Sequence, residues 1–160
     1  MIPLSVTLRG FHGFRAGLGL DEVSLDLSGL PPGLVAVTGQ NGAGKTTLLD
    51  NLQPFRIQPF KCRKSPDWSV GSFSYYDQCY GDNAMKELVF EMDGVRYKAV
   101  VLIDAVKRKQ EAYLYQQTRP HDNWMPLNDG KVKTYDEAVE KIMGTPSMFF
   151  SSVFRAQSAR

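Results

Sequence analysis

The residues best suited to chemistry lie in a glycine-rich stretch, TGQNGAGKTTLLD, at residues 38–50. It satisfies the pattern G-x-x-x-x-G-K-[ST], in which loop amides surround phosphates, a lysine reaches the β- and γ-phosphates and a hydroxyl ligates Mg²⁺. The glycines allow successive N–H groups to point inward as an anion nest. We therefore predict a site for ATP and Mg²⁺, with Thr46 on the metal and Lys45 as a catalytic residue. The predicted nucleotide-binding residues are Asn41, Gly42, Ala43, Gly44, Lys45, Thr46 and Thr47.

The flanking segments have the patterns that this motif requires. Leu34–Val37 is a continuous apolar run, typical of a strand covered on both faces in a parallel or mixed sheet. Thr46–Leu52 can form a helix with Leu48, Leu49 and Leu52 on one face, and Pro54 ends it. The motif thus lies between a predicted buried strand and a predicted helix start.

The period of two predicts further strands. Apolar residues alternate with polar ones over Leu4–Leu8 and again over Val23–Leu27, with an irregular glycine-rich connection, RGFHGFRAGLG, between them. Asp93-Gly94 stands between two alternating runs and predicts a hairpin. A third strand at Ala112–Gln117 would complete an antiparallel meander.

Two helices are predicted near the end of the chain. Thr134 and Glu137 fit a capping box, and Gly144 closes the first helix. Thr145 and Pro146 open a second helix. Residues 55–85 are rich in Pro, Ser, Gly and aromatic residues, and we expect a partly irregular or mobile insertion there.

Composition predicts one compact domain over residues 1–160, because 160 residues at 42% hydrophobic content suffice for a single core. The net charge of +2 neither implies nor excludes a nucleic-acid partner. With no long apolar run and two cysteines, we expect a cytoplasmic protein without a membrane partner. The basic groups at residues 107–109 and at Arg56, Lys61, Arg63 and Lys64 are read as solvated loops, with DNA phosphate contact as the alternative.

An ATP hydrolase of this class also needs an acidic residue after an apolar strand. Asp104 in VVLIDA is a candidate, but it follows the predicted hairpin, so we interpret it as part of an edge strand that leaves the sheet.

Several segments together resemble the N-terminal part of the head domain of SbcC-type ATPases, which are SMC-related members of the ABC class. These are LSVTLRGF, VSLDLSGL, LVAVTGQNGAGKTTLLD, KELVFEMDGVRYKAVVLID and FFSSVFRAQ. The resemblance implies an α/β P-loop NTPase lobe of the ABC class, with a mixed sheet, an antiparallel meander and flanking helices. It also implies that Gln157 is the Q-loop residue, catalytic and near Mg²⁺, and that His12 lies near the nucleotide.

In this family the chain continues beyond the glutamine into a coiled coil and a C-terminal lobe. The resemblance implies partnership with that lobe, with a second head that sandwiches ATP, with a nuclease subunit and with DNA, in double-strand-break repair. The intact protein would hydrolyse ATP, whereas residues 1–160 alone would bind it weakly and turn it over negligibly. Two alternatives are a RecF-like or anti-phage P-loop ATPase and a non-catalytic nucleotide-binding module.

Overall fold

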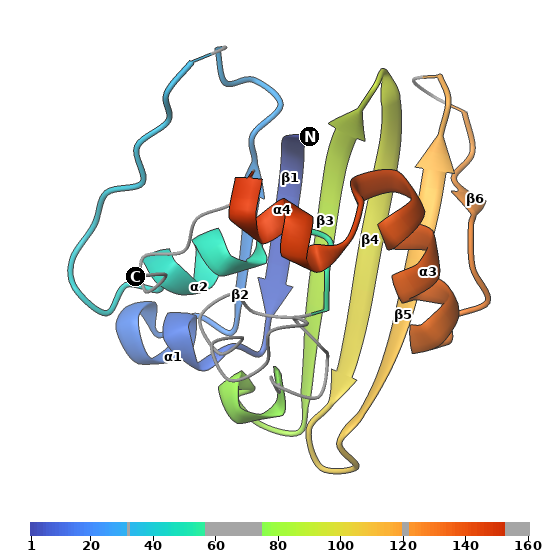
Figure 1. Cartoon of the computed structure of the whole chain (residues 1–160). Coiled ribbons are helices and arrows are strands. Elements are labelled where there is room, and N and C mark those ends of the chain that lie inside the picture. Colours follow the sequence, from blue (N-terminus) through green and yellow to red (C-terminus); the bar gives the residue numbers. More distant parts are fainter. Residues whose placement is uncertain (32, 57–74, 120–121, 153–160) are drawn as a thin grey trace.

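The computed structural model describes residues 1–31, 33–56, 75–119 and 122–152. Within these residues, six strands form one sheet in the order β2-β1-β3-β4-β5-β6 (Figure 1). The strands are β1 (Ile2–Arg9), β2 (Glu22–Asp26), β3 (Asn83–Met92), β4 (Val95–Asp104), β5 (Lys109–Gln117) and β6 (Met125–Pro126). The helices are α1 (His12–Leu18), α2 (Lys45–Asn51), the 3₁₀ helix η3 (Tyr75–Gln78), α3 (Val132–Met143) and α4 (Pro146–Ser152).

Strand β1 lies between β2 and β3 and pairs with both in antiparallel fashion. Leu8 stands opposite Val23 of β2, and Val6 stands opposite Leu88 of β3. The predicted strands at Leu4–Leu8 and Val23–Leu27 are confirmed. The chain between β2 and β3, which contains the glycine-rich loop, therefore starts and finishes beside β1.

The predicted meander is confirmed as β3, β4 and β5. Asp93 and Gly94 have φ angles of 53° and 75°, the left-handed conformations of a two-residue hairpin turn. Strand β3 begins at Asn83, well before the first apolar residue of the predicted run, Leu88.

The core lies between one face of the sheet and the helices. Figure 1 shows α2, α4 and α3 lying across this face. Strand residues with side chains pointing into the core alternate along each strand, as a half-buried sheet requires. They are Val6, Leu8, Ala84, Leu88, Phe90, Ala99, Val101, Ile103, Ala112 and Leu114. Tyr135 and Val139 of α3 and Phe149 and Phe150 of α4 complete the core.

The segment after α2 is part of this core. Phe55 packs against Phe149, with ring centroids 5.3 Å apart, and the Tyr135 hydroxyl donates to the Pro54 carbonyl. Arg56 is buried and donates to Asp136 and Gln110. The interpretation of Arg56 as part of a solvated basic cluster is wrong, since a buried guanidinium needs the carboxylate it contacts.

The predicted strand at Leu34–Val37 is not formed. Figure 1 shows this segment arching away from the sheet, and Leu34 is fully exposed. A strand of this kind needs neighbours on both edges and cover on both faces, and no described residue pairs with it. The pairings among the described residues are all antiparallel, which differs from the predicted mixed sheet.

The connection RGFHGFRAGLG is also more regular than predicted. It forms α1, because Phe14 is buried at its centre and Gly19 closes it in a left-handed conformation, with its N–H 3.1 Å from the Arg15 carbonyl oxygen. Glycine lowers helix propensity, so packing rather than propensity stabilises this helix.

Helix α3 begins earlier than the capping box predicted. Its N-cap is Lys131, and Thr134 lies in the first turn, within hydrogen-bond distance of the Asp129 carboxylate and the Lys131 carbonyl oxygen. The closing Gly144 is confirmed, and so is the start of α4, where the Met148 N–H donates to the Thr145 hydroxyl at 3.4 Å.

Within the described residues, no helix is both long and apolar enough to span a bilayer. Of the predicted insertion at residues 55–85, the described parts include buried Phe55 and Arg56 and the helix η3. Lys61, Arg63 and Lys64 lie outside the described residues, and so does Gln157.

Candidate nucleotide site

The glycine-rich loop connects the exposed segment at residues 34–37 to the first turn of α2. Gly39, Gly42 and Gly44 have φ angles of 153°, 85° and 79°, which other residues rarely adopt. At Gly44 a side chain is also excluded by packing, since a Cβ atom would lie 2.5 Å from Cδ1 of Phe14. The Leu48 N–H donates to the Gly44 carbonyl oxygen at 2.9 Å, so the helix begins directly after the loop.

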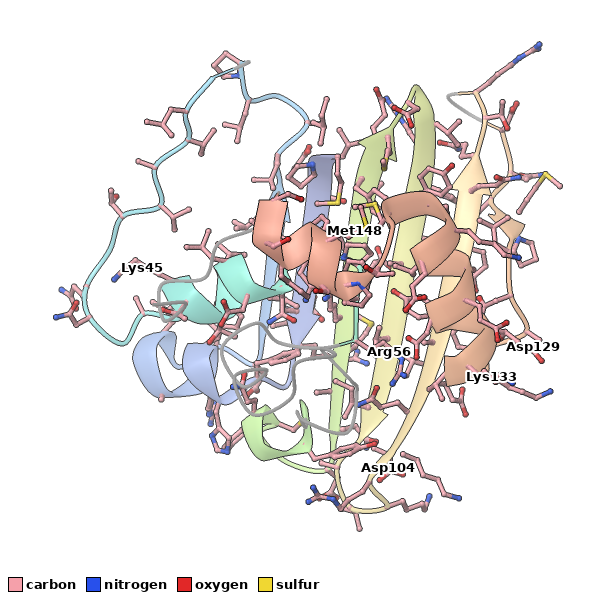
Figure 2. All side chains as sticks on the ribbon, in the orientation of Figure 1. Lys45, Arg56, Asp104, Asp129, Lys133 and Met148 are labelled. Carbon is pink, nitrogen blue, oxygen red and sulfur yellow. The ribbon has the colours of Figure 1, made fainter. Side chains whose placement is uncertain are left out.

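Lys45 turns its ammonium group back toward the loop. Its Nζ atom donates to the carbonyl oxygens of Gly39 at 2.8 Å and Gln40 at 2.7 Å. Figure 2 shows Lys45 on the loop side of α2, far from Lys133 on α3. The cation is thus held among loop carbonyls, where an anion entering the loop would be its stronger partner.

The two threonines at the start of α2 differ in their surroundings. Thr46 is exposed, and its hydroxyl makes no hydrogen bond to any described residue. Thr47 is half-buried and faces Gly13 of α1. A free hydroxyl beside the loop lysine fits a Mg²⁺ ligand, because Mg²⁺ prefers oxygen ligands and is bound together with phosphates.

A cavity of about 330 Å³ opens between α1, β2 and the loop. Phe14 and Leu18 of α1 and Val23 and Leu25 of β2 form an apolar wall. The loop contributes the rest of the lining through Val37, Thr38, Gly39, Gln40, Ala43, Gly44 and Lys45. The cavity therefore combines an apolar surface with backbone amides and a lysine, which suits a ligand with a ring at one end and phosphates at the other.

His12 is not among the residues that line this cavity. Its ring packs edge-on against Tyr80, with centroids 5.7 Å apart, and the Arg15 guanidinium lies 5.0 Å from the centroid of the Tyr80 ring. The structure therefore does not bring His12 together with the loop residues, and its role near a nucleotide stays a prediction. Gln157 lies outside the described residues, so its predicted role also stays a prediction.

Beneath α2 lies a polar cluster that sequence reasoning missed. Asp50 is 4% exposed, while Asn51 of α2 and Lys86 of β3 are fully buried. Lys86 donates to the Phe55 carbonyl oxygen at 3.2 Å. The sequence does hold a signal, because Lys86 occupies an inward position between Ala84 and Leu88 in the alternating pattern of β3.

Burial changes the ionisation of both charged groups in this cluster. It raises the pKa of Asp50 to about 6, and the Lys86 ammonium partly offsets this change. It lowers the pKa of Lys86 to about 7, with the Asp50 carboxylate acting in the opposite direction.

The predicted helix face also needs correction. Leu48 is buried, but Leu49 is 43% exposed, and Asp50 and Asn51 take the inward positions instead. Helix α2 therefore rests on the sheet through polar groups as well as through leucine.

The remaining acidic candidate, Asp104, lies at the end of β4. Its carboxylate accepts from the Lys107 N–H at 2.8 Å and lies 3.3 Å from the Lys107 ammonium. Figure 2 shows Asp104 at the lower end of the strands, well separated from Lys45 beside the loop. Asp104 is the last residue of β4, which agrees with its interpretation as a strand end, but β4 pairs with both β3 and β5, so the predicted edge strand is wrong.

A loop of this sequence, leading into a helix that lies on a sheet, is the arrangement of P-loop nucleotide-binding proteins of the α/β class. The family model of the AAA domain matches residues 5–53, which is less than half of the chain but includes the whole loop and α2.

The SbcC component of the nuclease SbcCD from Deinococcus radiodurans is 28% identical to this chain over 145 residues, which is 90% of the chain. The chain spans 14% of the length of that relative. The predicted resemblance to an SbcC-type ATPase is thereby confirmed.

Proposed function

We propose that this chain is the ATP-binding lobe of an SbcC-like, SMC-related ATPase of the ABC class that acts in DNA double-strand-break processing. The observation that carries the proposal is the loop itself, with Lys45 directed at the carbonyls of Gly39 and Gln40 and with three glycines in positive-φ conformations. The similarity to a component of a nuclease from Deinococcus radiodurans supports the family and the link to DNA.

In this proposal the chain's own groups bind and orient the nucleotide. The amides of residues 41–47 hold the phosphates, and Lys45 exchanges its two carbonyl partners for the β- and γ-phosphates. The Thr46 hydroxyl holds Mg²⁺, which when bound neutralises phosphate charge. The apolar wall formed by Phe14, Leu18 and Val23 excludes water from one side of the site.

The site is incomplete for hydrolysis within the described residues. Its acidic strand-end candidate, Asp104, is engaged with Lys107 and lies well apart from Lys45. We therefore assign hydrolysis to the intact protein, in which a C-terminal lobe and a second head sandwich ATP and Gln157 completes the Mg²⁺ shell. A nuclease subunit and DNA are the further partners.

The exposed apolar run at Leu34–Val37 supports the proposal that a further lobe packs beside this chain. Its apolar side chains face solvent, although the sequence is that of a buried strand. An additional strand beside it would bury these side chains and satisfy its backbone.

A second candidate is a non-catalytic module in which nucleotide is a structural ligand. The distance in the fold between Asp104 and the loop favours it for the chain by itself. Comparing ATP turnover of a protein containing both lobes with that of its Lys45→Ala variant separates the two, because equal rates would exclude the enzymatic role.

Binding is tested on the 160-residue chain by titration with ATP and Mg²⁺. We expect Lys45→Ala to weaken binding about tenfold or more, since hydrogen bonds to charged groups contribute about 1.5–3 kcal/mol. Lys133→Ala is the matched control, because Lys133 is an exposed lysine on α3, remote from the loop. Equal affinities of the native chain and Lys45→Ala would overturn the proposal.

A further inference from the structure

Helix α1 presents two glycines, Gly13 and Gly17, to the P-loop. They are four residues apart and so lie on the same face of the helix. A Cβ atom at Gly17 would overlap the Gly42 carbonyl oxygen, and it would lie 2.6 Å from the Gly42 carbonyl carbon and 2.8 Å from Cα of Ala43. A Cβ atom at Gly13 would overlap the Thr47 hydroxyl and lie 3.0 Å from Cβ of Thr47.

These two contacts differ in how easily they could relax. At Gly17 the neighbours are backbone atoms of the P-loop, so an added methyl group must displace the loop itself. At Gly13 the nearest atom is a side-chain hydroxyl that can rotate. Between the two glycines, Phe14 is buried and lies directly against Gly44. The loop is therefore in close contact with α1 at three successive points.

The residues that flank α1 are joined by backbone hydrogen bonds just beyond the ends of β1 and β2. The Gly10 N–H donates to the Asp21 carbonyl oxygen at 2.8 Å, and the Tyr80 N–H donates to the Gly10 carbonyl oxygen at 2.6 Å. A helix fixed in this way can fix the loop that packs on it.

We propose that α1 is a positioning helix of the nucleotide site, and that Gly13 and Gly17 determine nucleotide affinity through their close contacts with Thr47 and with the Gly42 peptide, Gly17 also lining the cavity. Gly17 sets the position of the Gly42 peptide, and Gly13 sets the rotamer of Thr47. This inference rests on the proposed function, because it concerns the geometry of the same ATP site.

The effect of alanine on helix stability distinguishes a positioning role of the two glycines from an effect confined to α1 itself. Alanine is favoured over glycine in a helix interior by about 1 kcal/mol, so alanine at either position would stabilise α1 if the helix had no close neighbour. Because the neighbour is the P-loop, both substitutions weaken nucleotide binding. Gly17→Ala has the larger effect, about tenfold or more, since small misplacements of binding groups are costly.

The experiment compares the native chain with Gly13→Ala and Gly17→Ala, with titration of a fluorescent ATP analogue in the presence of Mg²⁺ and thermal denaturation as a second measurement. Gly29→Ala is the matched control, because a Cβ atom at Gly29 would meet open space. We expect Gly29→Ala to bind as the native chain does, and Gly13→Ala and Gly17→Ala to bind progressively more weakly in that order. Native affinity in both helix variants would overturn the inference.

A double-variant cycle keeps the test valid even if Gly17→Ala does not fold. Thr47→Ala removes the hydroxyl that an alanine at position 13 would meet. Adding Gly13→Ala to Thr47→Ala should therefore cost less affinity than adding it to the native chain, whereas additive losses would overturn the inference. If the native chain itself does not bind the analogue, the proposed function fails. If it binds and the variants bind equally well, the positioning role alone fails.

Discussion

Arg56 and Asp136 form a bidentate ion pair, although they are 80 residues apart in the chain. The Arg56 Nε atom lies 2.8 Å from Oδ1 of Asp136, and the Nη2 atom contacts Oδ2. The Arg56 Nη1 atom also donates to the Gln110 side-chain oxygen at 2.7 Å. One buried guanidinium thus joins the segment after α2 to α3 and β5.

Asp136→Ala should lower the free energy of unfolding by about 3 kcal/mol. The substitution leaves the Arg56 cation buried and unpaired with this carboxylate, and breaking a buried pair costs about 3–5 kcal/mol. The lower end applies because the Asp136 side chain is 31% exposed. Urea unfolding measures the change, with Glu137→Ala as the control on the exposed face of α3. A loss as small as that of the control would show that the ion pair contributes little.

The stability contribution of Asp50 and Lys86 should be lowest between about pH 6 and 7. The pKa of Asp50 is raised from 3.8 to about 6, so the folded state keeps a proton that the unfolded state loses. The free energy of unfolding therefore falls as pH rises from 3.8 to about 6. The pKa of Lys86 is lowered to about 7 from 10.5, so stability rises again as pH increases from about 7 toward 10.5.

The variant Asp50→Asn/Lys86→Met isolates this effect from the other titrating groups. Its free energy of unfolding, measured by urea denaturation at about pH 4.5, 6.5 and 9 and compared with that of the native chain, should show its greatest relative gain at about pH 6.5. A difference that does not change with pH would mean that neither group titrates abnormally.

Thr46→Val should reduce the Mg²⁺ dependence of ATP binding while the chain still folds. The hydroxyl is exposed and bonded to no described residue, so its loss leaves no buried group unsatisfied. ATP titrations with and without Mg²⁺ measure the effect, and Thr118→Val in an exposed bend serves as the control. Unchanged metal dependence in Thr46→Val would refute the assignment of this hydroxyl.

Leu34→Ser should change the stability of the chain by no more than about 0.5 kcal/mol, since the side chain is fully exposed. Leu88→Ala should cost about 2–5 kcal/mol, since Leu88 is completely buried in the core. Thermal or urea unfolding compares the two. A large loss from Leu34→Ser would indicate that the segment at residues 34–37 packs onto the sheet in solution.

The parts of the fold that the sequence predicts depend on local signals. The Asp93-Gly94 turn, the alternation along β1 and Gly144 after α3 each involve residues close in the chain, and all are confirmed. The prediction of a strand at Leu34–Val37 is wrong because a buried strand requires neighbouring strands, which a local sequence pattern does not reveal. Helix α1 was missed because its glycines lower helix propensity, and only its packing against the loop compensates.

In the candidate site, too, local sequence patterns predict some features and tertiary contacts determine the others. The position of the P-loop between an apolar segment and α2 follows from its sequence pattern, and the structure brings Lys45 and the loop carbonyls together. Tertiary contacts decide the rest. The spacing of Gly13 and Gly17 and the inward position of Lys86 are visible in the sequence, but only the folded chain shows that their neighbours are Gly42, Thr47 and Asp50.

The double pairing of β1 affects how the protein can change over evolutionary time. Because β2 and β3 both join β1, the sheet forms its hydrogen-bonded ladders without using any backbone group of the nucleotide loop. The entropic cost of closing a longer connection between two strands grows only with the logarithm of its length. An insertion at the exposed turn around Gly29 would therefore leave the register of β1 with β2 and β3 unchanged.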